Sequence, residues 1–186
     1  MRIIAGRWRG VRLASLGKGD AVAHLRPTAD RVRESLFNVL AGGAFGDPLT
    51  DAVVLDLFAG TGALGLEALS RGAAEAVLVE NGRKSAALIT ENIRLTRAGE
   101  AARLVRLDAT RLPACSGRPA TLVFLDPPYG KGAGERALSS ARTGGWIAPG
   151  ALVVWEEAAP QKPPEGFAPV GTRRYGDTHV TFLEQL

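Results

Sequence analysis

The sequence predicts an α/β fold: a Rossmann-like, doubly wound and mostly parallel sheet that ends in an antiparallel hairpin. Three observations predict it. From Ala52 onward, short apolar runs alternate with segments of helical periodicity, which is typical of βαβ units with right-handed crossovers. The first run, AVVLDLF, is almost wholly apolar and β-branched, as expected for a strand buried on both faces. Residues 168–186 contain two strand-like runs joined by Gly176-Asp177 with no helix between them, which indicates a terminal hairpin at the sheet edge.

The N-terminal part of the chain precedes this alternation. Its start, MRIIAGRWRGVRL, alternates weakly and is broken by two glycines, which favours a short β-ribbon. Residues 16–25 are expected to form a loop. A helix is expected over residues 26–43, where Thr28 or Asp30 can cap the first turn and Gly42-Gly43 ends the last. The apolar stripe of this helix is expected to be Val32, Leu36, Val39 and Leu40.

The alternating elements follow in order. Strands are expected over residues 52–58, 75–80, 102–109, 121–126 and 150–157, followed by the two hairpin strands within 168–186. Helices are expected over residues 62–72, 83–99 and 135–142. The sequence contains no internal repeat and no low-complexity tract. The sequence therefore predicts a single domain over residues 1–186, with a basic ribbon and loop at 1–25, the N-terminal helix at 26–43 and a catalytic core at 52–186.

Composition restricts the class of protein. With 186 residues, of which 46% are apolar and 23% charged, the chain is long enough for one domain with a core and is not disordered in composition. No apolar run approaches the roughly 20 residues of a membrane span, and the basic start lacks the apolar stretch of a signal peptide. One cysteine and two distant histidines make a metal site unexpected. We therefore expect a cytoplasmic protein without a membrane partner or a metal, and a monomer by default.

Positive charge is concentrated at the N-terminus. The formal net charge is +4 and the isoelectric point is about 9.7. Within the first 33 residues only Asp20 and Asp30 oppose a set of eight basic side chains: Arg2, Arg7, Arg9, Arg12, Lys18, Arg26, Arg31 and Arg33. A basic arm in front of a balanced domain indicates a polyanionic partner. A solvated N-terminus is the alternative.

A glycine-rich turn follows the first core strand. DLFAGTGALG places Asp56, Gly60, Gly62 and Gly65 between a strand and a helix. Glycine lets a ligand approach the backbone N–H groups, and doubly wound folds bind ligands at this edge of the sheet. The spacing fits G-x-G-x-x-G, which alone is weak evidence, and the absence of Gly-Lys-Ser/Thr excludes a P-loop. A carboxylate directly before the glycines favours a ligand with a positive amine over a pyrophosphate.

Acidic residues end three successive core strands. Beyond Asp56, Glu80 lies about 20 residues past the glycines, where an acid typically binds a ribose diol, and Asp108 is within reach of an adenine amine. S-adenosylmethionine carries an amino acid, a ribose and an adenine, so the sequence predicts it as the cofactor. Each acid also has a structural alternative. Asp56 could accept from loop N–H groups, Glu80 could support the next helix, and Asp108 could cap a turn.

The fourth core strand ends in VFLDPPYGKG. Two consecutive prolines remove two backbone donors and fix φ twice, so they make a rigid exit from the strand. An exocyclic base amine is a poor nucleophile because its lone pair is delocalised, and preorganised acceptors for both N–H groups would localise that pair. We expect Asp126 and the Pro127 carbonyl to be these acceptors, in a loop stiffened by Pro128, with Tyr129 stacked on the base. A turn with a buried tyrosine is the alternative.

DLFAGTGALGLEALSRGA together with LDPPYGKG resembles the class I S-adenosylmethionine-dependent amino-methyltransferases. RPTADRVRESLFNVL and MRIIAGRWRG narrow the resemblance to the RsmD-type 16S ribosomal RNA methyltransferases of the guanine(966)-N2 type. It extends from Met1 to RRYGDTHVTFLE and implies a seven-stranded sheet with a reversed last strand. It further implies methyl transfer from S-adenosylmethionine to the N2 amine of one guanine in the 16S rRNA of the small subunit. Naked rRNA and a partly assembled small ribosomal subunit are both open as the substrate.

The resemblance also implies roles for individual residues. Arg26, Pro27 and Thr28 would border the methionine end of the cofactor, and the GRWRG ribbon would contact RNA. The full set expected to bind the cofactor is Arg26, Pro27, Thr28, Asp56, Phe58, Ala59, Gly60, Thr61, Gly62, Glu80, Asn81, Asp108, Ala109 and Asp126. The set expected to bind RNA is Arg7, Trp8, Arg9, Arg12 and Arg31.

Three other functions are open from the sequence. D-P-P-Y is shared with DNA adenine-N6 methyltransferases, so it is specific for the chemistry and not for the substrate, although the chain has no separate target-recognition domain. A nicotinamide oxidoreductase could use the three glycines, but it would leave D-P-P-Y unexplained. A non-catalytic RNA-binding module could use the basic arm, but it would have no need for acids at the strand ends.

Overall fold

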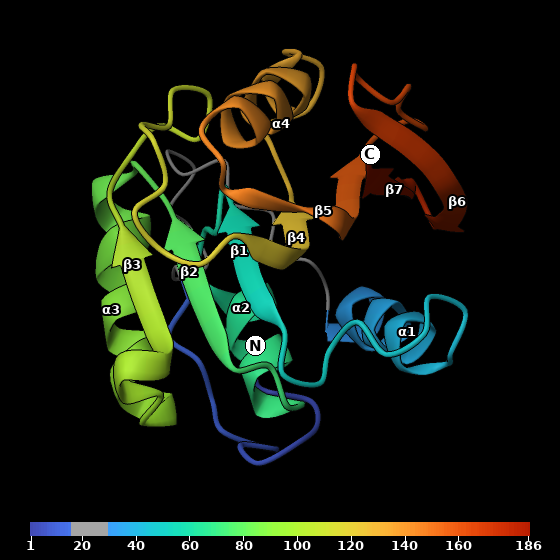
Figure 1. Cartoon of the computed structure of the whole chain (residues 1–186). Helices are drawn as coiled ribbons and strands as arrows, with labels where there is room; N and C mark the ends of the chain where they lie inside the picture. The colour runs from blue at the N-terminus through green and yellow to red at the C-terminus, as the bar shows by residue number, and fades with distance from the viewer. Residues whose placement is uncertain (16–29) are drawn as a thin grey trace.

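A seven-stranded sheet with the order β3-β2-β1-β4-β5-β7-β6 organises the described part of the chain (Figure 1). The structure is a computed structural model and describes residues 1–15 and 30–186; the expected loop over 16–25 and the predicted cofactor residues Arg26, Pro27 and Thr28 lie outside them. The strands are β1 (Val53–Leu57), β2 (Glu75–Val79), β3 (Ala102–Val105), β4 (Ala120–Leu125), β5 (Ile147–Glu157), β6 (Phe167–Tyr175) and β7 (Thr178–Gln185). The helices are α1 (Asp30–Ala41), α2 (Ala63–Ser70), α3 (Arg83–Thr96) and α4 (Ala133–Thr143), with a short 3₁₀ turn at Gly99–Ala101.

The sheet is parallel except at its C-terminal end. Strands β3, β2, β1, β4 and β5 pair in parallel, whereas β7 pairs antiparallel with both β5 and β6. The chain moves outward from β1 to β3 and then returns past β1 to β4, so the direction of winding switches between β1 and β4. The predicted doubly wound, mostly parallel sheet with a terminal hairpin is confirmed.

Helices cover both faces of the sheet. Side chains of successive strand residues point to opposite faces, so Val54 packs with α1, α2 and α3, while Val53 and Leu55 pack in a second cluster with α4. All five residues of β1 are buried, as its almost continuous apolar run predicted. The carboxyl ends of the parallel strands therefore open on a single edge, which is the expected position of the site.

Two differences from the prediction affect the site and the basic arm. Strand β3 ends at Val105, because the Leu107 N–H donates to the Val105 carbonyl and turns the chain before Asp108. In α1 the fully buried side chains include Arg33, which its charge had assigned to the basic arm, whereas Val32 and Val39 are only half-buried. Arg33 is thus a core cation and is not available to a polyanion.

The N-terminal ribbon, residues 1–14, lies along α2. Its two arms are joined by the Arg2–Arg12 bridge. The buried carboxylate of Glu67, in the middle of α2, accepts hydrogen bonds from the N–H groups of Ile4 (2.8 Å) and Ala5 (3.0 Å). The ribbon also requires a glycine at Gly6, where φ is +80° and a Cβ would lie 1.8 Å from a backbone oxygen of α2. The predicted ribbon is therefore present and is fixed to the helix that follows the glycine loop.

Candidate active site

The register of the parallel strands forms one row of side chains at the carboxyl edge. Leu57 of β1 pairs with Val79 of β2 and with Leu125 of β4. Leu125 in turn pairs with Trp155 of β5. The next residue along each strand therefore lies in a row just beyond these pairs, and the row consists of Glu80, Phe58, Asp126 and Glu156. Three of its four members are acidic, and we call it the acidic row.

The glycine loop turns sharply from β1 into α2. Gly60 and Gly62 have φ angles of 58° and 75°, which glycine adopts without steric cost, and Phe58 has a strained φ of 60°. Gly65 serves packing, since a Cβ there would lie 2.4 Å from the Leu78 side chain of β2. Two glycines thus shape the turn, and the third lets α2 approach the sheet closely.

Glu80 braces the glycine loop from the neighbouring strand. Its Oε2 accepts from the Gly60 N–H at 2.9 Å, and its Oε1 accepts from the Gly82 N–H at 2.7 Å, just before α3 begins. The structural alternative considered for this acid, support of the following helix, is therefore present. Each carboxylate oxygen has a second lone pair, so ribose hydroxyls could donate to the same group.

Asp56 ties the end of β1 to the first turn of α2. Only 1% of this residue is exposed, and its Oδ2 accepts from the Gly65 N–H at 3.0 Å. Burial raises the pKa of Asp56 to about 7; the bond from Gly65 opposes this effect, and the nearby Glu80 reinforces it. The structure gives Asp56 the loop-bracing role that was one of its two interpretations.

Asp108 lies beyond β3 and caps a turn. Its Oδ1 accepts from the backbone N–H of Thr110 (2.9 Å) and from the Thr110 hydroxyl (2.8 Å). These bonds lower the pKa of Asp108 below its ordinary value, so its exposed carboxylate is ionised at neutral pH. Of the other predicted cofactor residues here, Asn81 is exposed next to Glu80, and Ala109 is buried.

The DPPY loop leaves β4 beside the glycine loop. The Asp126 N–H lies 3.5 Å from the Leu57 carbonyl of β1, which continues the strand pairing by one residue. Pro127 is buried, Pro128 is exposed and the Tyr129 ring is half-buried. The strand exit and its aromatic ring therefore lie adjacent to the glycine turn, and the stiffness of this exit stays a prediction.

Two acids that end β5 hold the DPPY loop in position. Glu156 Oε1 accepts from the Tyr129 hydroxyl at 3.2 Å, and Glu157 Oε1 accepts from the Gly130 N–H at 2.9 Å. Both glutamates are only 8% exposed. Neither glutamate was among the predicted site residues, although VVWEE repeats the pattern of an apolar strand that ends in acid.

Several acidic side chains lie close to Asp126. Burial is the main reason that its pKa lies well above the ordinary value, and Glu156, Asp56 and Glu157 raise it further. Burial also raises the pKa of Tyr129 to about 12, with Glu156 as the next cause. Carboxylates from three neighbouring strands thus act on one another, and this edge of the sheet favours a cationic ligand.

The predicted RNA-contacting residues do not join the acidic row. Arg7, Trp8 and Arg9 lie at the tip of the ribbon, where the N–H groups of Arg7 and Trp8 donate to the Ser70 carbonyl and hydroxyl oxygens. Ser70 is at the opposite end of α2 from the glycine loop, about 12 Å away at the usual helical rise. The Arg7 guanidinium lies 4.0 Å from the centre of the Trp8 ring. Two further predicted contacts, Arg12 and Arg31, are exposed on the ribbon and on α1.

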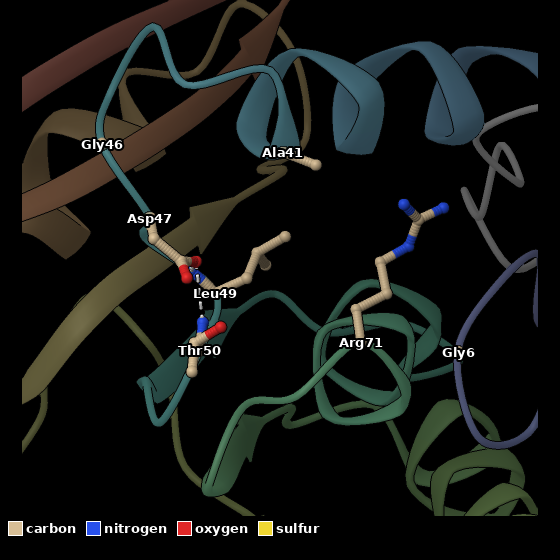
Figure 2. A pocket seen from close by; sticks show the side chains of 7 residues that line it. All are labelled: Gly6, Ala41, Gly46, Asp47, Leu49, Thr50 and Arg71. Carbon is tan, nitrogen blue, oxygen red and sulfur yellow. Dashed lines mark hydrogen bonds between the residues drawn. The ribbon is translucent and has the colours of Figure 1, made fainter.

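A cavity of about 440 Å³ lies at the other edge of the sheet, between the end of α1 and the end of α2 (Figure 2). The Arg71 side chain extends into it toward α1, while Asp47 accepts hydrogen bonds within its own loop from Leu49 and Thr50. No residue of the acidic row lines this cavity. It is therefore separate from the candidate active site.

Over residues 1–15 and 30–186, no helix has the length and apolar character needed to cross a bilayer. The same residues include no group of three or more His, Cys, Asp or Glu side chains placed to hold a metal ion.

The antiparallel strand β7 distinguishes this sheet from the parallel sheet of a nicotinamide-binding fold. A glycine loop after β1, an acid after β2 and a DPPY loop after β4 then surround the edge where a ligand would bind. Fold and site together define a Rossmann-like methyltransferase.

Comparison with known proteins identifies the family. The family model described as "Conserved hypothetical protein 95" matches residues 1–184, and the chain belongs to this family of RsmD-type methyltransferases. It is 44% identical over 156 residues to "Ribosomal RNA small subunit methyltransferase D" of Escherichia coli (strain K12), covering 84% of this chain and 74% of the relative. The protein of the same name from Haemophilus influenzae is 37% identical over 161 residues, covering 84% and 78%. The solved structure of yhhF from Escherichia coli has a TM-score of 0.80 at 36% identity, covering 100% of this chain and 97% of that one.

The raised pKa of Asp56 predicts how the free energy of unfolding depends on pH. The unfolded chain releases the Asp56 proton near pH 3.8, whereas the folded chain holds it up to about pH 7. Stability is therefore greatest at the acidic end of this range and falls as pH rises through 7, by on the order of 4 kcal/mol from this group. We expect Asp56→Asn, which keeps an acceptor for Gly65, to reduce this fall in urea titrations.

A matched control separates this effect from a general loss of carboxylates. Hydrogen bonds from Thr50 and Leu49 lower the pKa of the exposed Asp47, so Asp47→Asn should leave the slope above about pH 5 unchanged. Equal slopes in the wild type and in Asp56→Asn would show that Asp56 is ionised in the folded chain, contrary to our interpretation.

Proposed function

We propose that this protein transfers a methyl group from S-adenosylmethionine to the N2 amine of a guanine in 16S rRNA. The observation that carries the proposal is the position of the DPPY loop beside the glycine loop, within a row of carboxylates. Relatives named as small subunit rRNA methyltransferases support the RNA substrate. The exposed arginines of the ribbon, Arg2, Arg7, Arg9 and Arg12, suit a phosphate backbone. We further propose that the protein acts as a monomer in the cytoplasm, on 16S rRNA or on a partly assembled small subunit.

The residues at the carboxyl edge suit S-adenosylmethionine chemically. We assign Glu80 to the ribose diol and Asp108 to the adenine amine, and the turn at Gly60 and Gly62 to close backbone approach. The carboxylates around Asp126 favour a ligand with an ammonium and a sulfonium group. The walls of the cofactor site would be completed by Phe58, Ala59, Thr61, Asn81 and Ala109. The methionine end of the cofactor would be bordered by Arg26, Pro27 and Thr28. When bound, this cofactor supplies an electrophilic methyl group.

The DPPY loop would prepare the guanine amine for attack. The Asp126 carboxylate and the Pro127 carbonyl each accept a hydrogen bond from the amine, which localises its lone pair. The guanine must leave its stack to reach them, and the Tyr129 ring then stacks on it. Glu156 orients that ring through the Tyr129 hydroxyl. After transfer the surplus proton can leave through Asp126 or through water.

Transfer to the N6 amine of adenine in DNA is the second candidate, because the same amine clamp would serve it. Radiolabelled S-adenosylmethionine offered with a 16S rRNA transcript, with small subunits that lack the modification, and with DNA separates the two. We expect labelled N2-methylguanosine after digestion of the RNA to nucleosides. Labelled N6-methyladenine from DNA, or no transfer to either RNA substrate, would overturn the proposal.

The amine clamp makes a prediction for single-turnover kinetics. Removing an acceptor that acts in the transition state should lower the rate of Asp126→Ala by about 10²–10³-fold, with RNA affinity unchanged. Asp126→Asn keeps one acceptor oxygen and should retain more of the rate. Glu184→Ala is the control, because it removes an exposed carboxylate on β7 that lies far from the acidic row. A wild-type rate in Asp126→Ala would refute the clamp.

A further inference from the structure

We propose that Asn92 is a positioning residue that couples RNA binding by the N-terminal ribbon to cofactor binding by the glycine loop. The inference rests on the proposed function, since it takes the ribbon as an RNA contact and the loop as a cofactor contact. It concerns a residue of α3 that belongs to neither of these segments but bonds to both of them.

The Asn92 amide joins the end of the ribbon to the glycine loop. Its Oδ1 accepts from the Ala14 N–H at 2.7 Å, and its Nδ2 donates to the Ala14 carbonyl at 3.1 Å. The same Nδ2 donates to the Thr61 carbonyl at 2.8 Å. Asn92 thus pairs with both backbone groups of Ala14, as a neighbouring strand would. Its remaining N–H donates to the Thr61 carbonyl of the glycine loop.

Burial makes this arrangement specific. Asn92 is fully buried, so each of its polar atoms needs a partner inside the protein, and both of its N–H bonds are used. The short side chain also fixes the distance between the three backbone groups that it contacts. A movement of Ala14 must therefore either move the amide, and with it the Thr61 carbonyl, or break a buried hydrogen bond.

A second contact joins the same two segments. The Thr61 hydroxyl lies 3.8 Å from the Met1 sulfur, and the Met1 carbonyl accepts from the Leu13 N–H within the ribbon. One end of the ribbon thus contacts Thr61 directly through Met1, and the other end is connected to Thr61 through Asn92. The tip of the ribbon lies at the other end of α2, where Trp8 bonds to Ser70. The ribbon spans α2 from its proposed RNA-contacting tip to the cofactor loop.

RNA binding and cofactor binding are coupled because each of them orders the ribbon and the glycine loop. RNA that binds the tip restricts the ribbon, and the restriction reaches Thr61 through Asn92. A cofactor that then needs the loop in this conformation loses less conformational entropy on binding. Coupling in binding free energy is reciprocal, so the cofactor should strengthen RNA binding by the same factor.

The test measures the affinity for S-adenosylhomocysteine, which cannot react, by titration calorimetry with and without saturating RNA. The RNA is the substrate that accepts methyl groups from the wild type. We expect RNA to tighten binding by about 5–150-fold in the wild type, the usual range of such coupling. In Asn92→Asp, which removes both donors and sets a carboxylate against two carbonyls, the ratio of the two affinities should approach one.

Two further variants keep the test decisive. Ala14→Pro removes the N–H that donates to Asn92 Oδ1 and also fixes φ at this position. It leaves the Asn92 side chain intact, so it should lower the ratio even if Asn92→Asp folds poorly. Thr96→Val is the matched control: Thr96 lies one turn further along α3 and is also buried, and within the described residues its hydroxyl bonds to the backbone carbonyls of Asn92 and Ile93, not to the ribbon or the glycine loop. Thr96→Val should keep the wild-type ratio.

Each outcome has one interpretation. A purely structural Asn92 would weaken both affinities and leave their ratio unchanged, which would overturn the proposal, as would a wild-type ratio of one. A wild type that transfers no methyl group to RNA would overturn the proposed function and this inference together. Methyl transfer by the wild type with an unchanged ratio in the variants would overturn the inference alone.

Discussion

The parallel register of β1 with β2 and β4 is the constraint on which the site depends. Leu57 lies level with Val79 and Leu125, so the residues that follow them meet at one edge. A slip of one residue would turn Glu80 or Asp126 to the other face of the sheet. Both faces of β1 are buried, and this burial fixes the register and hence the acidic row.

Helix α2 connects the site to the rest of the molecule. The glycine loop leads into its first turn, Gly65 lets it approach β2, and Asp56 holds that turn. Further along, Glu67 and Ser70 fix the ribbon by hydrogen bonds to its backbone. The segment proposed to contact RNA and the loop proposed to contact the cofactor therefore share one short helix, although they meet opposite ends of it.

Local patterns in the sequence were sufficient to predict the fold and many of the residues at the carboxyl edge of the sheet. An apolar run that ends in an acidic residue indicates a buried parallel strand with the acid at its carboxyl end. Glu80 and Asp126 were predicted at this edge for that reason. Contacts between distant segments were not accessible in this way: Asn92 and Ala14 are 78 positions apart, and nothing near either residue indicates the other. Arg33 was misassigned for a related reason: besides Asp30 on its own helix, at 3.0 Å, it faces the buried carboxylate of Glu67 on another helix, at 3.9 Å. Sequence spacing also left two roles open for Asp56, and burial with the Gly65 bond supports the structural one.

The central claim is that the acidic row forms the wall of a nucleoside cofactor site next to the DPPY loop. A crystal structure of the protein with S-adenosylhomocysteine tests it most directly. Our account predicts the ribose hydroxyls within hydrogen-bonding distance of Glu80, the adenine beside Asp108, and the sulfur facing Asp126. A ligand bound elsewhere, such as in the cavity beside Arg71, with Glu80 bonded only to Gly60 and Gly82, would contradict it.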